Sequence, residues 1–147
     1  MDKETILKNV NTKKEAVITL NNGEILRGII SEIKESHCIL DETTAFGDMV
    51  VVKYDDIKAV RNTYPVNVYE NIAGSYYAEV RTIAGTGILR STRELNVTFS
   101  IKDGEFVLIG GDYINCGGWY DLESVEELEY LCPGIVEDLK VAPVQKR

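Results

Sequence analysis

The chain has 147 residues, of which 44% are hydrophobic and 27% are charged, and its formal net charge is −8. This composition is typical of a globular protein with one or two cores and excludes a disordered chain. No apolar run reaches the ~20 residues of a membrane span, and the N-terminus lacks the basic and apolar segments of a signal peptide, so we expect a cytoplasmic protein.

The negative charge is concentrated in the C-terminal half of the chain. Between Asp103 and Asp138 there are ten acidic residues and no Lys or Arg. Affinity for nucleic acids depends mostly on Lys and Arg side chains that neutralise phosphates. We therefore expect no non-specific binding of RNA or DNA by the whole surface.

The cysteines and the single histidine predict neither disulfides nor a metal site. Cys38, Cys116 and Cys132 are odd in number, far apart in sequence and form no CxxC pair. His37 has no second histidine with which to build a site. We expect free thiols and no cofactor.

The first sixty residues have the pattern of a short helix followed by five strands. Asp2 is the expected N-cap of the helix, and Asn21-Asn22-Gly23 predicts a hairpin turn because this turn needs positive φ. Gly28 falls inside the second strand, where a residue without Cβ permits a bend or bulge suited to a small closed barrel. The predicted strands cover residues 15–20, 24–34, 37–41, 48–54 and 57–61.

Two segments of this pattern resemble the Sm-like family, which includes the Hfq-like RNA chaperones. The stretch from Leu20 through Gly28 to Ile33 resembles the first Sm motif, and the stretch from Phe46 to Val60 resembles the second. The resemblance covers about residues 1–61 and implies a five-stranded barrel of SH3 type with an N-terminal helix. It also implies a homo-oligomer in which the fourth strand of one subunit joins the fifth strand of the next. Another small SH3-type barrel is the alternative.

The residues by which the family binds RNA are absent from this chain. Lys34 stands at the position of the family's Asp, and His37 or Cys38 stands at the position of its Asn. The family's Arg-Gly pair is replaced by Val52-Lys53 or Lys53-Tyr54, and the Lys-His pair of the Hfq subgroup is replaced by Tyr54-Asp55. The resemblance therefore implies the fold without the RNA pocket.

The fourth predicted strand is apolar without interruption. Met49, Val50, Val51 and Val52 do not alternate with polar residues. This run indicates burial on both faces, as in a subunit contact, and it fits a plain core strand equally well.

The segment from Arg61 to Pro65 is the predicted boundary between two units. We assign residues 1–62 to the barrel and residues 66–147 to a smaller β unit with one C-terminal helix. Strands are expected from Val66 to Tyr69 and from Tyr76 to Thr82, followed by a hairpin over residues 95–109.

The C-terminal helix has clear boundary signals. Ser124 and Glu127 form a capping box at its start, and Cys132-Pro133-Gly134 ends it. The tail from Val141 to Arg147 is expected to be mobile.

No arrangement of residues predicts catalysis. The hydroxyl pairs Thr43-Thr44 and Ser91-Thr92 have no base at a diagnostic spacing, and Gly85-Thr86-Gly87 lacks the remainder of a phosphate-loop motif. We expect a protein that is not an enzyme.

Two groups of residues are candidates for binding. Arg81, Arg90 and Arg93, with Tyr76 and Tyr77 nearby in sequence, would suit a nucleotide-sized anion if the strands bring them together. Scattered arginines that balance nearby acids are the alternative.

The second candidate is an acidic surface with aromatic side chains. It comprises Tyr113 and Trp119, in a predicted loop bracketed by two glycine pairs, with Glu123, Glu126 and Glu127 of the helix. A negative field with exposed aromatics suits a basic protein partner, whereas a plain amphipathic helix is the alternative. We expect a non-catalytic, oligomeric inhibitor or adaptor. An Sm-like RNA binder with an altered pocket and a protein that sequesters a small anion or nucleotide remain alternatives.

Overall fold

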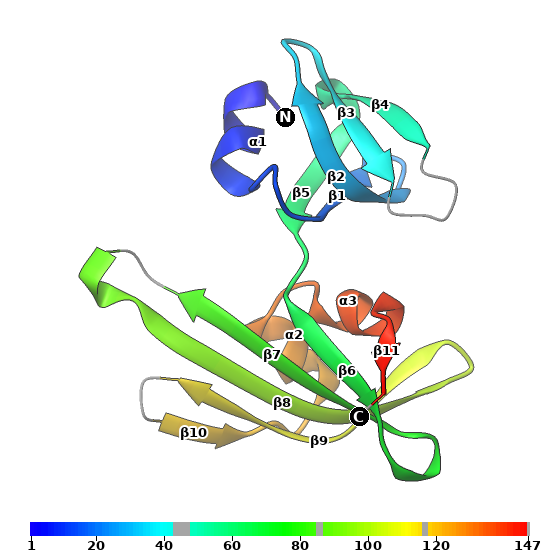
Figure 1. The fold of residues 1–147 in the computed structure, drawn as a ribbon, viewed down its shortest axis with the longest axis vertical. Helices are drawn as coiled ribbons and strands as arrows, with labels where there is room; N and C mark the ends of the chain where they lie inside the picture. Colours follow the sequence, from blue (N-terminus) through cyan, green and yellow to red (C-terminus); the bar gives the residue numbers. More distant parts are fainter. Residues whose placement is uncertain (43–47, 85–86, 116–117, 147) are drawn as a thin grey trace. The chain divides into compact units, whose positions relative to one another are not determined.

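The chain divides into two compact units, unit 1 (Met1–Thr63) and unit 2 (Tyr64–Arg147), each with its own sheet (Figure 1). The computed structural model describes residues 1–42, 48–84, 87–115 and 118–146. Within these ranges each of the three α-helices has seven residues, and none is long and apolar enough to cross a membrane.

Unit 1 is an N-terminal helix followed by a five-stranded antiparallel sheet, as the sequence predicts. The strand order is β4-β3-β2-β1-β5. Its elements are α1 (Lys3–Asn9), β1 (Ala16–Leu20), β2 (Ile25–Ile33), β3 (His37–Glu42), β4 (Met49–Lys53), a 3₁₀ turn η1 (Tyr54–Asp56) and β5 (Ile57–Asn62).

Local signals explain where these elements begin and turn. The Asp2 side chain accepts a hydrogen bond of 2.8 Å from the Thr5 amide and caps α1. Gly23 has φ +90° in the β1–β2 hairpin, a conformation that glycine adopts readily. Both predictions are confirmed.

Gly28 marks a very close approach of β2 to β3. A Cβ at this position would lie 2.2 Å from the backbone oxygen of Asp41. The β2–β3 register slips between Ile30 and Glu32, so a bulge follows the glycine in the same strand.

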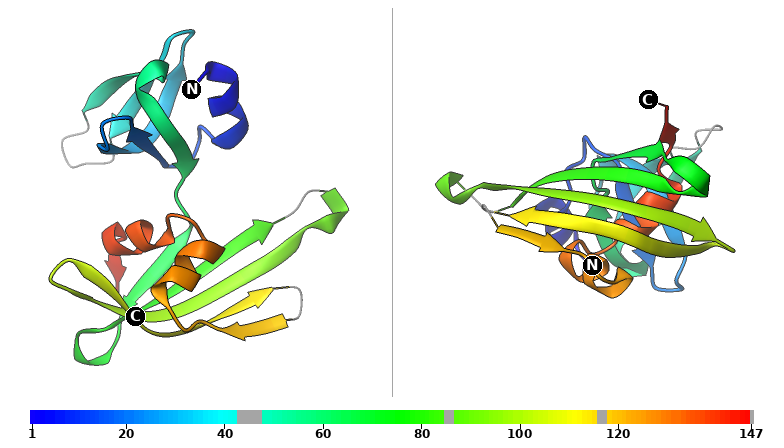
Figure 2. Two further views of the ribbon diagram at one scale, coloured as in Figure 1. Left: turned by 180° about the vertical axis from the view of Figure 1, so that it is seen from behind. Right: turned by 90° about the horizontal axis from the view of Figure 1, so that it is seen from below.

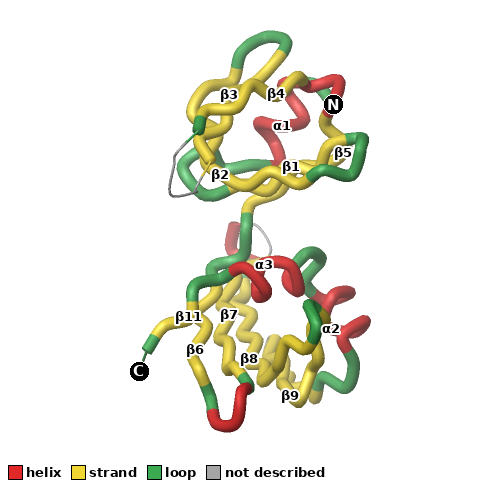
Figure 3. Tube along the Cα trace, turned by 90° about the vertical axis from the view of Figure 1, so that its right-hand side faces the viewer, coloured by secondary structure: helices red, strands yellow, loops and turns green. Residues whose placement is uncertain are grey.

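The core of unit 1 lies between the curved sheet (Figure 3) and α1. Among the described residues β4 pairs only with β3 and β5 pairs only with β1, so no strand pairing closes the sheet into the expected barrel. Both outer strands therefore present an edge. The buried residues are Ile6, Val10, Ala16, Ile18, Ile30, Cys38, Leu40, Val52, Tyr54 and Ile57.

Unit 2 has a six-stranded mixed sheet of order β10-β9-β8-β7-β6-β11, antiparallel except for the parallel β11–β6 pair. Its strands are β6 (Val66–Glu70), β7 (Tyr76–Ala84), β8 (Ser91–Lys102), β9 (Glu105–Asn115), β10 (Gly118–Asp121) and β11 (Val144–Gln145). Its helices are α2 (Val125–Leu131) and α3 (Ile135–Val141), with short 3₁₀ segments η2 (Ile72–Gly74) and η3 (Gly87–Leu89).

Two sequence predictions about unit 2 are wrong. It has two C-terminal helices where one was expected, because α2 ends at its C-cap Cys132 and a second helix begins directly after Gly134, which has φ +88°. It is larger than unit 1, with six strands. In the segment expected to be mobile, Val144 and Gln145 pair with β6.

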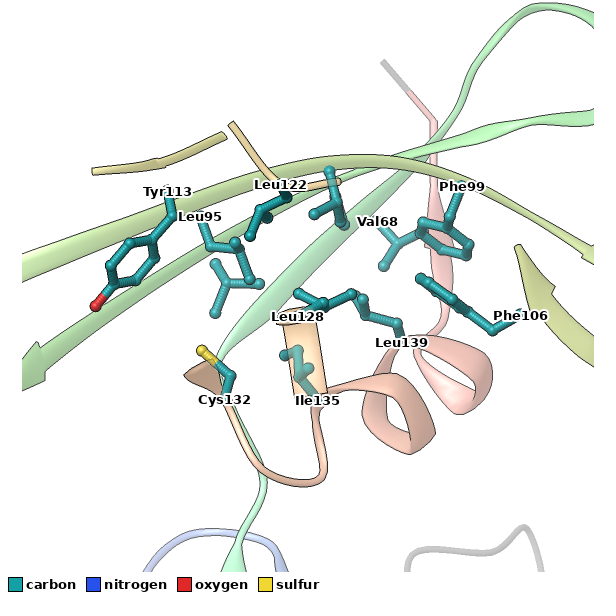
Figure 4. Packing of buried hydrophobic residues seen from close by; sticks show 13 residues of the cluster. Val68, Leu95, Phe99, Phe106, Tyr113, Leu122, Leu128, Cys132, Ile135 and Leu139 are labelled. Carbon is teal, nitrogen blue, oxygen red and sulfur yellow. The ribbon is translucent and has the colours of Figure 1, made fainter. Parts of the chain in front are cut away.

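Both helices pack on one side of the sheet, which we call the helix side; the opposite side is the outer side (Figure 3). Figure 4 shows Leu128, Ile135 and Leu139 of the helices facing Val68, Leu95 and Phe99 of the strands. Phe99 and Phe106 stack with their ring centroids 4.7 Å apart. This cluster is the only described core of unit 2, so it fixes which side of every strand is buried.

Candidate protein-binding surface

The aromatic residues singled out from the sequence lie on strands, not on the expected loop. Gly110 and Gly111 continue β9, and Gly118 begins β10, which pairs with β9. In the register Trp119 lies opposite Ile114, and Tyr120 lies opposite Tyr113.

The two sides of β10 differ in their surroundings. Tyr113 is buried in the helix-side core, and its ring centroid lies 6.4 Å from that of Tyr120. Trp119 has the opposite orientation and lies on the outer side, because side chains alternate along a strand. Trp119 is 62% exposed and Tyr120 is 57% exposed. Tyr113 is therefore a core residue, whereas Trp119 and Tyr120 are available to a partner.

β10 is the outermost strand at its margin of the sheet (Figure 2). The Leu122 amide, one residue after β10, donates a 2.8 Å hydrogen bond to Gly111 O in β9, so the backbone groups of Leu122 face β9. Backbone groups of alternate residues in a strand point to the same side, so the N–H and C=O groups of Trp119 and Asp121 point away from β9. No described residue pairs with these four groups.

Carboxylates surround this strand. Asp121 lies directly opposite Asp112 in the β9–β10 register, and two like charges in this position repel each other. Glu123 follows β10 and is exposed, as is Glu126 on α2, while Glu127 is half-buried. Ser124 caps α2, because its Oγ accepts a 3.1 Å hydrogen bond from the Glu127 amide.

Three of the ten acids between positions 103 and 138 have structural roles. Glu129 accepts hydrogen bonds from the amides of Gly134 (2.8 Å) and Val136 (3.2 Å) at the start of α3. Glu137 pairs with Lys140 at 3.5 Å, and buried Asp138 accepts a 2.9 Å bond from the Tyr64 amide. The other seven have no ion-pair partner within the described ranges.

The arginines of the other candidate group do not converge. Arg81 lies on the outer side and pairs with Glu94 at 2.9 Å. Arg93 is on the helix side, because it lies two residues before buried Leu95 in β8. Arg90 is exposed and precedes β8. The two tyrosines also separate: Tyr76 contacts Phe99 (ring centroids 5.5 Å apart), and the Tyr77 hydroxyl donates to Asn96 Oδ1 at 3.0 Å.

A groove of about 350 Å³ lies on the outer side near Arg81. Its wall has one guanidinium and the carboxylates of Glu79 and Glu94, so its charge does not favour an anion. The lining residues are Pro65, Asn67, Glu79, Val80, Arg81, Glu94 and Asn96.

Arg93 and Asn115 form a polar pair that sequence reasoning missed. They are opposite one another in the β8–β9 register. Arg93 Nε and Asn115 Oδ1 are buried and have no hydrogen-bond partner among the described residues. Burial raises the pKa of the nearby Cys132 thiol, and the Arg93 charge opposes that shift.

The residues at the Sm-family RNA positions make local contacts. The Tyr54 hydroxyl donates to Lys34 O at 2.5 Å, and Lys34 Nζ lies 3.6 Å from a Glu32 carboxylate oxygen. His37 Nδ1 and Ser36 Oγ share a 3.1 Å hydrogen bond.

Several expectations lie outside the described residues: Phe46 and Gly47 of the second Sm motif, Thr43-Thr44, Gly85-Thr86, Cys116 and Gly117. Cys38 and Cys132 are free thiols, as expected. Over the described ranges no group of three or more potential ligands could hold a metal ion.

Comparisons of the chain with models of protein families, with curated proteins and with solved structures find no match.

Proposed function

We propose that this protein is a non-catalytic interaction protein, an inhibitor or adaptor whose unit 2 binds a basic protein partner. The contact surface is the acidic edge, which we define as Trp119, Tyr120, Asp121, Glu123 and Glu126. The observation that supports it is the juxtaposition of two exposed aromatic residues with carboxylates that have no basic partner in the described structure.

Charge and aromatic area make separate contributions to such binding. Uncompensated carboxylates attract a basic protein over a Debye length of about 8 Å at physiological salt and accelerate its association. Exposed Trp and Tyr side chains provide the apolar contact area that is enriched in protein interfaces. The proposal therefore predicts an affinity that falls with salt and also depends on Trp119.

The test is binding to immobilised polylysine by the full-length protein and by two charge-reversal variants. We expect the double substitution Glu123→Lys and Glu126→Lys to weaken binding at least about tenfold, or ~1.4 kcal/mol. The matched control is Glu70→Lys with Glu105→Lys, which changes the net charge equally. Both control residues are exposed and outside the acidic edge.

The control separates a local surface from a net-charge effect. If the two double variants lose affinity equally, binding follows the overall charge and the acidic edge is not the contact surface. Trp119→Ala should weaken binding without changing its salt dependence, because no charge is removed.

We also propose that unit 1 is an Sm-like sheet that associates with further copies through β4 and β5. The two strands are the edges of its sheet. On β4, Met49 is 66% exposed and Val51 is 63% exposed, while Val52 is buried. Exposed apolar side chains on an unpaired edge are typical of strands that pair with another chain.

Mass measurement by light scattering tests this association. Val51→Lys should reduce the mass to that of a monomer, whereas Leu7→Lys, at an exposed position of α1, should leave it unchanged. A monomeric parent protein would contradict the proposal. Because the residues at the RNA positions differ from the family's, we expect no retention of RNA in a filter-binding assay at low salt.

A further inference from the structure

β10 has the properties of a strand that can be extended by a partner strand. The backbone N–H and C=O groups of Trp119 and Asp121 point away from β9 and have no partner among the described residues. Such groups are the hydrogen-bonding template of an exposed sheet edge. A peptide that adds as a strand satisfies them through its own backbone and gains specificity from alternate side chains.

Charge determines which strand can be added. Asp112 and Asp121 are cross-strand neighbours on the outer side, and neither has an ion-pair partner in the described structure. A second copy of β10 would place another Asp121 beside this pair and increase the repulsion. A strand with Lys or Arg side chains on the outer side would instead neutralise it, so charge complementarity favours a basic strand over self-pairing.

Trp119 supports the same choice of partner. Its side chain is 62% exposed and lies on the outer side of β10, as does Asp121 two residues later. A guanidinium can stack on an indole face and pair with a carboxylate. Arg is therefore better suited than Lys to the outer-side positions of the added strand.

We propose that the acidic edge binds its partner by strand addition: an extended basic segment, with Arg at alternate positions, pairs with β10 through the Trp119 and Asp121 backbone groups. This inference rests on the proposed function and specifies the form of the partner. The binding segment is an extended strand of alternating basic and apolar residues, not a helix or a folded basic surface.

The test uses the full-length protein and the acetylated, amidated hexapeptide Arg-Val-Arg-Val-Arg-Val. Binding is followed by the fluorescence of Trp119, the only tryptophan in the chain. Two further peptides have the same sequence and charge but are N-methylated either at the three Arg amides or at the three Val amides. In an added strand only alternate amides face β10, so methylation of one set blocks pairing and methylation of the other does not.

The expected result is a loss of affinity of at least about tenfold for one methylated peptide and a near-parental affinity for the other. Equal affinities of all three peptides would overturn strand addition; the proposed function would stand if Glu123→Lys with Glu126→Lys still weakened binding. Equal losses for both methylated peptides would also overturn it, because they would reflect the peptide's own conformation. No binding of any peptide at low salt, while polylysine binds, would overturn strand addition alone.

Discussion

Gly28 gives the sharpest test of the unit 1 fold, because the Cβ of an alanine at this position would clash with backbone atoms of β3 and not with a flexible side chain. The added Cβ would lie 2.2 Å from Asp41 O and 2.8 Å from Asp41 C, whereas ordinary Cβ contacts begin near 3.4 Å. β2 and β3 would therefore have to separate locally by about 1 Å. We expect Gly28→Ala to destabilise unit 1 strongly.

The magnitude follows from what this separation costs. A shift of 1 Å stretches the adjoining N–H···O bonds beyond the range of about 2.7–3.2 Å, and the loss of two bonds costs about 1 kcal/mol each. Overpacking adds roughly 1–3 kcal/mol. The total of about 4 kcal/mol is a large part of the roughly 3–9 kcal/mol expected for a unit of this size.

Urea unfolding measured by hydrogen exchange and by fluorescence is the assay. Exchange of the β2 and β3 amides should accelerate in Gly28→Ala, while the Trp119 fluorescence transition, which reports on unit 2, should keep its midpoint. Gly110→Ala is the control, because no atom lies within 4 Å of its added Cβ. A Gly28→Ala protein as stable as the Gly110→Ala protein would refute the close approach of the two strands.

Three further predictions concern unit 2 and the buried thiols. Asn115→Leu removes a buried acceptor that has no hydrogen-bond partner among the described residues and should leave the free energy of unfolding unchanged or raise it by up to about 1 kcal/mol; a fall of that size in chemical denaturation would contradict this. Ser124→Ala removes the α2 cap and should cost about 1 kcal/mol in the same measurement, so an unchanged value would contradict the cap. Burial raises the pKa values of Cys38 and Cys132 in the folded protein. As pH rises, these thiols therefore ionise in the unfolded chain at a lower pH than in the folded protein. The contribution of the two protonated thiols to the free energy of unfolding should be complete below the ordinary thiol pKa of about 8.5 and decline above it. A free energy of unfolding that is constant from pH 8 to 10 in the parent protein would contradict this.

Short-range signals predict the turns well. Asn22-Gly23 and Asp103-Gly104 both mark hairpins, and Asp103 and Gly104 have φ values of +52° and +79°, as turns that join antiparallel strands require. Alternation in the first sixty residues places all five strands of unit 1, and hairpins between neighbours in sequence set three of its four registers. The pairing of β1 with β5 joins residues far apart in the sequence.

Elements that depend on distant contacts are not visible in the sequence. β11 has two residues and exists through its parallel pairing with Val68 and Tyr69. The helix α3 has only seven residues, and the amides at its start donate to the Glu129 side chain of the preceding helix, a contact that forms only when the two helices fold against each other. Isolated segments of these lengths lack sufficient intrinsic stability to leave a clear pattern.

For the candidate surface, the sequence indicates which residue types are present but not which side of the sheet each side chain occupies. Gly111 suggests a flexible loop in the sequence, yet in the structure it permits close packing, because a Cβ there would lie 2.8 Å from Asn96 O. The β8–β9 register skips Ile109, which reverses the alternation beyond it. This bulge buries Tyr113 and places Asp112 on the outer side, and a period-two pattern cannot show such a reversal.

Hydrogen exchange of the β10 amides is the decisive measurement of whether this strand pairs with an extended basic segment. We predict that a saturating concentration of the Arg-Val peptide protects the Trp119 and Asp121 amides at least about tenfold and leaves the Tyr120 amide, which already faces β9, unchanged. Unchanged exchange at Trp119 and Asp121 with the peptide bound would show that the peptide does not add to β10 as a strand.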